Sequence, residues 1–202
     1  MNKRVKQGLF LFFLLFFPSV FYVLLSTGKT NFTHLPYFGP KEVAANGDTI
    51  YHSIPSFRFL NQDGKYITDK DLYGKMYVAN FFFTTCKSIC PAMSAQLIRV
   101  QERFKDMDDV QILSHTVDPE NDSVEVLKEY SKNHIAINTK WNFVTGNKKE
   151  LYDIAQNGYL VNALEAGENA EEAFIHSELF ILIDLSLIHI SEPTRLRRIS
   201  YA

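Results

Sequence analysis

The sequence predicts an α/β domain with a largely parallel sheet, carried behind an N-terminal transmembrane helix. Three observations lead to this fold class. Residues 8–28 contain no charged side chain, short apolar runs further on alternate with stretches of helical periodicity, and the two cysteines, Cys86 and Cys90, directly follow a central apolar run. Strands that alternate with helices favour right-handed crossovers and a parallel sheet covered on both faces. Cysteines between a central strand and the following helix indicate a thioredoxin-like architecture.

The size and charge of the chain limit its organisation and partners. A chain of 202 residues with 46% hydrophobic residues has room for one ordinary domain plus appendages. The 21 Lys and Arg residues are balanced by 23 Asp and Glu residues, so no broad basic surface is available, and nucleic acid is excluded as a partner. We expect the following segments: a cytoplasmic N-terminus (1–7), an anchor (8–28), a tether (29–50), the thioredoxin-like domain (51–184) and a tail (185–202).

The uncharged stretch 8–28 is long enough to cross a bilayer, for which a helix needs about 20 apolar residues. The alternative is a cleaved signal peptide, but the apolar run exceeds the usual length and no A-x-A-like cleavage site follows it. Pro18 is tolerated inside a membrane helix when the freed backbone groups find other partners. Lys3, Arg4 and Lys6 keep the N-terminus in the cytoplasm by the positive-inside rule.

The membrane orientation predicts where the domain lies. Seven residues before the apolar run are too few for a mitochondrial presequence, so we expect a single-pass protein of the bacterial inner membrane with its domain in the periplasm. An oxidising compartment permits either a disulfide or a thiol pair kept reduced by a dedicated thiol reductant.

Within the domain, turn residues and apolar periodicity predict each element in order. An Asp63-Gly64 pair between two short strands indicates a hairpin, and the run 76–83 is too short for a helix and favours a central strand. Apolar positions at steps of three and four after Pro91 predict a helix. The other expected elements are strands at 110–117, 141–144 and 178–184, helices capped at 122–125 and at Asn147 with Glu150, and an acidic loop at 165–172.

The spacing of Cys86 and Cys90 suits two kinds of chemistry. If the helix already includes Cys86, the two side chains lie about 5 to 6 Å apart on one helix face. The sulfurs can then close into a disulfide or chelate one soft metal ion, and a helix N-terminus favours the thiolate that both reactions need. A structural disulfide or two buried thiols is the simpler alternative. The polar Lys87 and Ser88 between them indicate exposure instead.

Two thiolates are too few for structural zinc, which takes four ligands, and match copper(I), with an imidazole as a natural third donor. Each histidine is more often structural than a ligand. His176 is the strongest candidate because it immediately precedes an apolar strand, where a loop could face the cysteines. The other histidines are His34 in the tether, His52 before the domain, His115 in a strand, His134 at a helix end and His189 in the tail.

Three segments together resemble the Sco/SenC family of copper metallochaperones over roughly residues 36–184: VANFFFTTCKSICPAMSAQLIRVQERF, ILSHTVDPENDSVEVLKEY and FIHSELFILID. The resemblance implies a membrane-anchored thioredoxin-like protein that helps to assemble the binuclear copper centre of cytochrome c oxidase. It also implies that Cys86, Cys90 and His176 bind copper. Asp118 matches the acid of the family's Val-Asp-Pro segment, although an acid that caps the local turn explains it equally well.

From this resemblance we expect a copper carrier rather than an enzyme. Reduced Cys86 and Cys90 hold copper(I) with His176 and pass it to thiolates of the copper-bearing oxidase subunit, while oxidation to the disulfide abolishes binding. Binding of copper(II) is left open. The rival is a thiol:disulfide oxidoreductase that uses the same cysteines on a copper-protein partner. Such enzymes usually have two residues between their cysteines, whereas three are present here.

The tail after Asp184 differs in character from the rest of the chain. SLIHISEPTR resembles the conceptual translation of sequencing-adapter DNA, so we interpret residues 185–202 as a non-native end of a truncated domain. The alternative is a natural basic tail that touches the membrane through Arg195, Arg197 and Arg198. No turn signal follows Asp184, and we expect the strand 180–183 to present an unpaired apolar edge.

Overall fold

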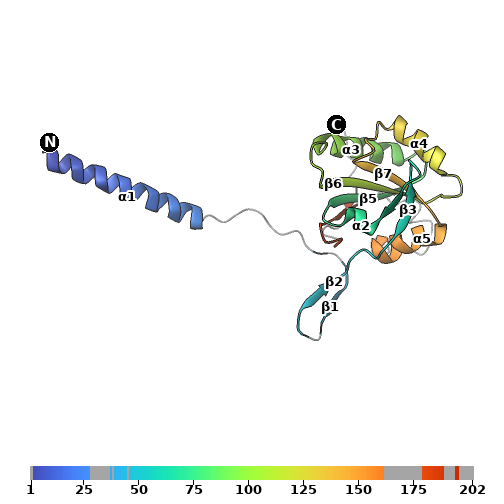
Figure 1. The fold of residues 1–202 in the computed structure, drawn as a ribbon, viewed down its shortest axis with the longest axis horizontal. Coiled ribbons are helices and arrows are strands. Elements are labelled where there is room, and N and C mark those ends of the chain that lie inside the picture. The colour runs from blue at the N-terminus through green and yellow to red at the C-terminus, as the bar shows by residue number, and fades with distance from the viewer. Residues whose placement is uncertain are drawn as a thin grey trace. The chain divides into compact units, whose positions relative to one another are not determined.

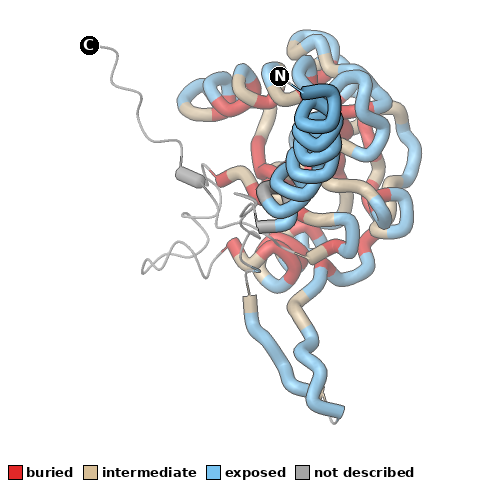
Figure 2. The backbone as a smooth tube through the Cα atoms, turned by 90° about the vertical axis from the view of Figure 1, so that its left-hand side faces the viewer, coloured by how far each residue is buried: buried red, intermediate tan, exposed pale blue. Residues whose placement is uncertain are grey.

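The computed structural model describes residues 2–27, 37, 39–44, 46–161, 179–188 and 194–195, and the chain forms two compact units, Met1–His34 and Leu35–Ala202. The first unit is the helix α1, Lys3–Thr27, which continues through Pro18 (Figure 1). Its described side chains are exposed along its whole length (Figure 2). Over Lys3–Val23 the helix is long and apolar enough to cross a membrane, so the predicted N-terminal apolar helix is confirmed.

The second unit is built on one mixed sheet with the strand order β4-β3-β7-β6-β5-β8-β9. Strand β5, which precedes the loop with the cysteines, has neighbours on both sides, as predicted. The strands are β3 Arg58–Asn61, β4 Tyr66–Thr68, β5 Met76–Phe82, β6 Val110–Thr116, β7 Trp141–Thr145, β8 Leu179–Ile183 and β9 Thr194–Arg195.

The expectation of a largely parallel sheet is wrong, because only β5, β6 and β7 run parallel to one another. The hairpin strand β3 pairs antiparallel with β7, and β8 returns antiparallel to β5. The helix between β5 and β6 and the helix between β6 and β7 are crossovers, and a crossover makes the two strands that it joins parallel. Their carboxyl ends share one edge of the sheet, which is where ligands bind in such folds.

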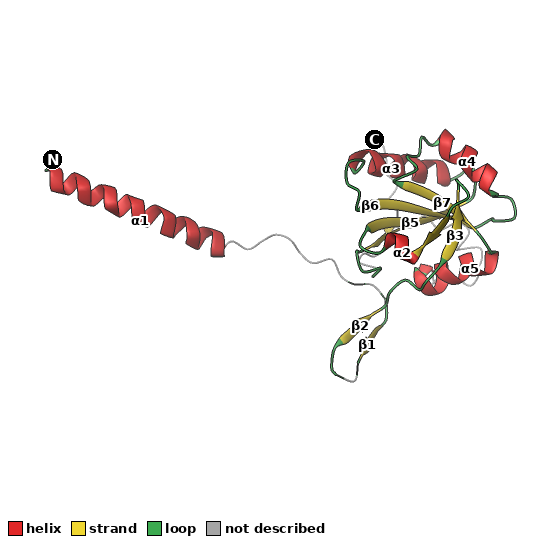
Figure 3. Cartoon of the chain, viewed as in Figure 1, coloured by secondary structure: helices red, strands yellow, loops and turns green. Residues whose placement is uncertain are grey.

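Helices cover both faces of the sheet (Figures 1 and 3). On one face, α3 Cys90–Arg103 and α4 Val124–Asn133 enclose an apolar cluster with Phe82 and Phe143. On the other face, α5 Lys148–Asp153 and the single π-helical turn η1 Ile154–Gly158 enclose a second apolar cluster. The short α2, Asp69–Leu72, buries Leu72 in this second cluster. We call these the cysteine face and the opposite face. The arrangement is the predicted thioredoxin-like α/β fold.

The helix ends follow the sequence signals. The Ser123 hydroxyl accepts a hydrogen bond from the amide of Val126 at the start of α4, and the Asn147 side chain accepts from the amides of Lys149 and Glu150 at the start of α5. In α3, Met93 and Leu97 are buried at a four-residue spacing and carry the apolar face. Local capping and periodicity were therefore sufficient to locate these helices.

The predicted tether contains a β-hairpin that the sequence analysis missed. Strands β1 Lys41–Val43 and β2 Thr49–Tyr51 pair antiparallel (Figure 3). Gly47 adopts a φ of 88° in the turn, and the Asn46 side chain bonds both the carboxylate and the amide of Asp48. An Asn-Gly pair is a strong hairpin signal. It was overlooked because the flanking strands are only three residues long and largely exposed.

A turn follows Asp184 although the sequence carries no turn signal there. The Asp184 carboxylate accepts hydrogen bonds from the amides of Ser186 and Ile188, which close a tight turn. Leu187 is buried in the cluster of the opposite face, and β9 pairs with Leu179 and Phe180. The edge of β8 is therefore paired at Leu179 and Phe180, in contrast to the expected unpaired edge. The origin of residues 185–202 and the segment limits stay predictions.

Candidate metal centre

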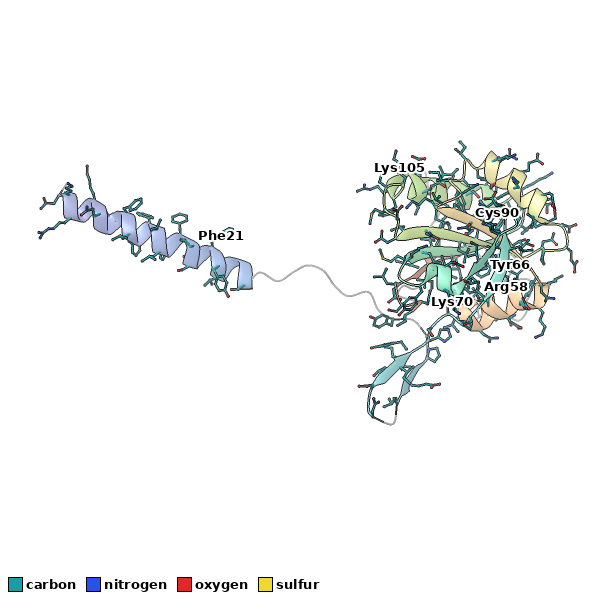
Figure 4. All side chains as sticks on the ribbon, viewed as in Figure 1. Phe21, Arg58, Tyr66, Lys70, Cys90 and Lys105 are labelled. Atoms are coloured by element: carbon teal, nitrogen blue, oxygen red, sulfur yellow. The ribbon has the colours of Figure 1, made fainter. Side chains whose placement is uncertain are left out.

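The two cysteines lie at the junction between β5 and α3, on the cysteine face. Cys90 is the first residue of α3 (Figure 4), and Cys86 lies in the preceding loop, where its amide bonds the carbonyl oxygen of Phe83 at 3.1 Å. The condition under which both would share a helix face is not met, because the helix begins only at Cys90. Both thiols are free, and both side chains are buried, in contrast to the exposure indicated by Lys87 and Ser88.

The pKa values of the two thiols are shifted in opposite directions. Burial raises the pKa of Cys86, but hydrogen bonds from Cys90 and Ser88 outweigh it and lower this pKa to about 7. The Ser88 hydroxyl lies 3.6 Å from the Cys86 sulfur. Burial, together with the hydrogen bond that Cys90 donates to Cys86, raises the pKa of Cys90 to about 12. At neutral pH Cys90 therefore keeps its proton, whereas Cys86 is about half thiolate.

This asymmetry defines what the pair can do. A soft metal ion or an electrophile meets the Cys86 thiolate first, and use of both sulfurs then releases the proton of Cys90. Two sulfurs on an apolar background suit a soft monovalent cation better than a hard divalent one. The donor set therefore fits copper(I).

Tyr130 of α4 lies close to the cysteine pair and was not predicted. Its ring stacks on Phe82 with centroids 5.1 Å apart, and its hydroxyl lies 3.4 Å from that of Ser94. Burial raises the pKa of Tyr130 to about 12, the Ser94 hydrogen bond opposes this, and negative charge on Cys90 and Cys86 adds to the rise. The phenol is therefore protonated at neutral pH and lines the sulfurs. Its helical spacing in the sequence indicated only a core residue.

Two acids follow β6, and the structure separates their roles. Asp118 accepts a hydrogen bond from the Asn121 side chain at 2.8 Å, and its carbonyl oxygen accepts from the amides of Asn121 and Asp122. Asp118 therefore organises the local turn, in agreement with the alternative given above. Asp122 is the buried acid, and it accepts hydrogen bonds from Thr84 and Thr116. Sequence analysis had assigned Asp122 only to the cap of α4.

The predicted third ligand is not tested by the geometry. Within the described ranges, no group of three or more His, Cys, Asp or Glu side chains could hold a metal ion. His52 lies with Nε2 2.8 Å from the carbonyl oxygen of Gly158, and His134 with Nδ1 2.9 Å from that of Tyr130. His115 is enclosed by aromatic rings on the opposite face. The remaining histidines lie outside the described residues: His34, His176 and His189.

A free, buried cysteine pair between the central strand and the first long helix of this sheet defines a dithiol protein of thioredoxin-like fold. Comparison with known families shows to which family of dithiol proteins the chain belongs. Residues 46–187 match the SCO1/SenC family, and the chain belongs to this family.

Individual relatives agree with this membership. The SCO1 protein homolog of Bacillus subtilis (strain 168) is 34% identical over 138 residues, which are 67% of this chain and 70% of the relative. A SCO1/SenC family lipoprotein from Bacillus anthracis str. Ames superposes with a TM-score of 0.61 at 32% identity, covering 72% of this chain and 86% of that chain.

Two further solved structures are of proteins that are described by what they assemble or bind. BsSco, described as a member of the Sco family of cytochrome c oxidase assembly proteins and as containing a disulfide switch, has a TM-score of 0.58 at 30% identity, covering 71% of this chain and 84% of that one. Yeast Sco1 was solved with copper bound, and its likeness has a TM-score of 0.56 at 23% identity, covering 73% of this chain and 84% of that one. The yeast likeness shows the fold alone.

Proposed function

We propose that this protein is a copper chaperone that binds copper through Cys86, Cys90 and His176 and delivers it to the binuclear copper centre of cytochrome c oxidase. The observation that carries the proposal is the buried free dithiol, with one sulfur ionised near neutral pH, in a Sco-family fold. The role of BsSco in cytochrome c oxidase assembly and the copper bound to yeast Sco1 support it.

Loading begins at Cys86, because its thiolate is present near neutral pH. Coordination by Cys90 follows with release of its proton, and the imidazole of His176 completes a three-coordinate site for copper(I). Transfer then exchanges these ligands for thiolates of the copper-bearing oxidase subunit. Exchange with an oxidised disulfide of the periplasm passes two electrons and the thiol protons of the empty pair to that disulfide and leaves an S–S bond between Cys86 and Cys90, so no thiolate remains to bind the metal. A thiol reductant restores the carrier.

The proposed location is the bacterial inner membrane, with α1 as a single-pass anchor in the lipid and the domain in the periplasm. The apolar helix α1 and the basic residues Lys3, Arg4 and Lys6 support this orientation. A related protein from Bacillus anthracis is described as a lipoprotein, which is another way of holding such a domain at a membrane. A protease-protection assay on spheroplasts tests it: cleavage of the domain from outside is expected, and full protection would contradict it.

Copper(I) titration of the reduced full-length protein in detergent, against a chromophoric chelator, tests the function. We expect about one tightly bound copper ion per chain, a fall toward zero in Cys86→Ser and Cys90→Ser, and a clear weakening in His176→Ala. His52→Ala is the matched control, since His52 bonds the carbonyl oxygen of Gly158 on the opposite face of the sheet. Undiminished binding in either cysteine variant would refute the carrier, and undiminished binding in His176→Ala would remove this ligand.

The second candidate is a thiol:disulfide oxidoreductase acting on the cysteines of a copper-protein partner. The observation in its favour is the acid Cys86 beside a proton-holding Cys90, which is the arrangement of an attacking and a resolving thiol. The same His176→Ala variant separates the two candidates. If the protein is a carrier, His176→Ala loses copper affinity while its dithiol still reduces an oxidised peptide. If the protein is a reductase, His176→Ala changes neither property, because dithiol reduction needs no imidazole from His176.

A further inference from the structure

We propose that Asp122 is a positioning residue for the cysteine pair, acting through Thr84. Its buried carboxylate joins the loop that carries Cys86 to the end of β6, and so holds the two sulfurs in the arrangement that binds the metal. This inference deepens the proposed function, and its effect on metal affinity rests on that function. The three bonded residues Thr84, Thr116 and Asp122 are called the carboxylate clamp below.

The clamp is defined by four hydrogen bonds onto one side chain. Asp122 is 1% exposed. Its Oδ1 accepts from the Thr84 hydroxyl, its Oδ2 accepts from the Thr116 hydroxyl, and the Thr84 amide lies 3.4 Å from Oδ1 and 3.3 Å from Oδ2. Thr116 belongs to β6 and Thr84 to the loop after β5. One carboxylate therefore connects two segments of the chain at the edge of the sheet where the cysteines lie.

The energetics make this connection firm. A buried carboxylate is very costly unless hydrogen bonds satisfy it, and hydrogen bonds to an ionised group are stronger than neutral ones. No cation lies within ion-pair distance of Asp122 in the described part of the chain. Its charge is therefore stabilised by the two hydroxyls and the Thr84 amide, and loss of any of these donors weakens the clamp.

The clamp is adjacent to the chemistry without taking part in it. Thr84 lies two residues before Cys86, and the intervening turn is closed by the bond from the Cys86 amide to the Phe83 carbonyl oxygen. Negative charge on Cys90, Cys86 and Asp122 raises the pKa of Tyr130, so all three groups are close enough to act electrostatically on one phenol. Motion of Thr84 is transmitted over this short turn to the Cys86 sulfur.

The two functional states of the pair require different sulfur positions. In a disulfide the sulfurs are about 2.05 Å apart. Two thiolates on one metal ion are farther from each other, since in zinc sites, for example, each sulfur lies about 2.3 Å from the metal. Cys90 is held by α3, so Cys86 is the sulfur that must move. A clamp that holds the loop in the dithiol arrangement favours metal binding over disulfide formation. Groups that hold metal ligands in place typically change metal affinity by roughly 10- to 100-fold when they are removed.

The test uses the full-length reduced protein and four variants. Asp122→Asn removes the charge with little change in shape, and Thr84→Val removes one hydroxyl at constant volume. We expect both to weaken copper(I) binding at least about tenfold and to shift the dithiol–disulfide equilibrium with glutathione toward the disulfide. Thr84→Ser keeps the hydroxyl and is expected to restore both quantities to within about twofold of the wild type.

Gln101→Met is the matched control for loss of stability alone. Gln101 is equally buried and bridges the far end of α3 to the backbone of Ile135 and Ile137. Its replacement lowers the urea unfolding midpoint and leaves copper affinity and the glutathione equilibrium unchanged. The clamp is overturned if Asp122→Asn and Thr84→Val lower only the unfolding midpoint, as Gln101→Met does. If the wild type binds no copper, the proposed function fails, and the glutathione equilibrium alone decides on the clamp.

Discussion

The two faces of the sheet treat buried polar groups differently. On the cysteine face, the Ser114 hydroxyl donates to Asn80 at 2.6 Å and accepts from the Trp141 indole at 2.8 Å, and Asp122 is bonded as described above. On the opposite face, His115 is completely buried and neither ring nitrogen has a hydrogen-bond partner among the described residues. The comparison teaches that the buried polar groups near the dithiol are held by hydrogen bonds, whereas the imidazole of the opposite face is held by aromatic rings. The opposite face supports the sheet mainly by aromatic packing.

His115 provides the largest expected effect. Its ring lies 5.2 to 6.4 Å from four aromatic rings, those of Phe57, Phe59, Phe81 and Tyr159, and burial lowers its pKa to about 3. The titratable group that faces it is Tyr159, hydrogen-bonded to Tyr77. Burial raises the pKa of both phenols, so they stay neutral throughout the acid range.

Acid should therefore destabilise the domain through this face. Below the unfolded pKa of about 6.5 the unfolded chain binds a proton that the folded chain refuses, so stability rises with pH and is lost as the pH falls from 6.5 toward 3. Between pH 7.5 and 4.5 we expect a loss of about 3 kcal/mol from this residue, measured by urea unfolding. His115→Phe should remove this part of the pH dependence, whereas His134→Phe should keep it. Parallel pH curves for the wild type and His115→Phe would contradict the assignment.

The polar network of the cysteine face gives the next effect. Ser114→Ala leaves the Trp141 N–H and the Asn80 oxygen without their partner, and we expect a loss of about 2 kcal/mol of unfolding free energy. Ser131→Ala is the matched control, because its hydroxyl bonds only the Lys128 carbonyl oxygen within α4, and its cost should be well below 1 kcal/mol. Equal costs for the two changes would show that the network contributes nothing specific.

A smaller effect concerns the acidity of Cys86. With its pKa at about 7, the rate of alkylation by iodoacetamide should rise about tenfold between pH 6 and pH 8, following the thiolate fraction. Cys90→Ala removes the side-chain hydrogen bond from Cys90, one of those that lower this pKa, and keeps the one from the backbone amide, so the midpoint should move to higher pH. Mass spectrometry after limited alkylation identifies the modified residue. Preferential modification of Cys90 in the wild type would reverse the assignment of the two sulfurs.

The smallest expected effect lies at the end of α4, on the cysteine face. Ile135 is 74% exposed and adopts a left-handed φ of 52°, a conformation that is costly for a β-branched residue and natural for glycine after a helix. Ile135→Gly should therefore stabilise the domain by about 1 kcal/mol in thermal or urea unfolding. Ile137→Gly, which has no such backbone geometry, should destabilise it. A loss of stability in Ile135→Gly would show that its side chain makes a contact worth more than the strain.

Local patterns in the sequence determined a large part of this protein. Uncharged length predicted α1, short apolar runs predicted β5, β6 and β7, and capping residues such as Asn147 predicted where helices begin, because each signal is contained within a few neighbouring residues. The cysteine spacing with its flanking segments was enough for family membership. These features depend on interactions between residues that are close in the sequence, so the order of residues is enough to predict them.

Tertiary structure alone decided the rest. The direction of β8 beside β5, the position of Cys86 outside the helix and the aromatic surroundings of His115 depend on which segments meet in space. Thr84 and Asp122 are in contact although they are 38 positions apart in the sequence, and no local pattern of residues predicts this contact. Burial of that carboxylate is favourable only because the hydroxyl of the distant Thr84 and that of the nearby Thr116 both bond it, and this arrangement exists only in the folded chain.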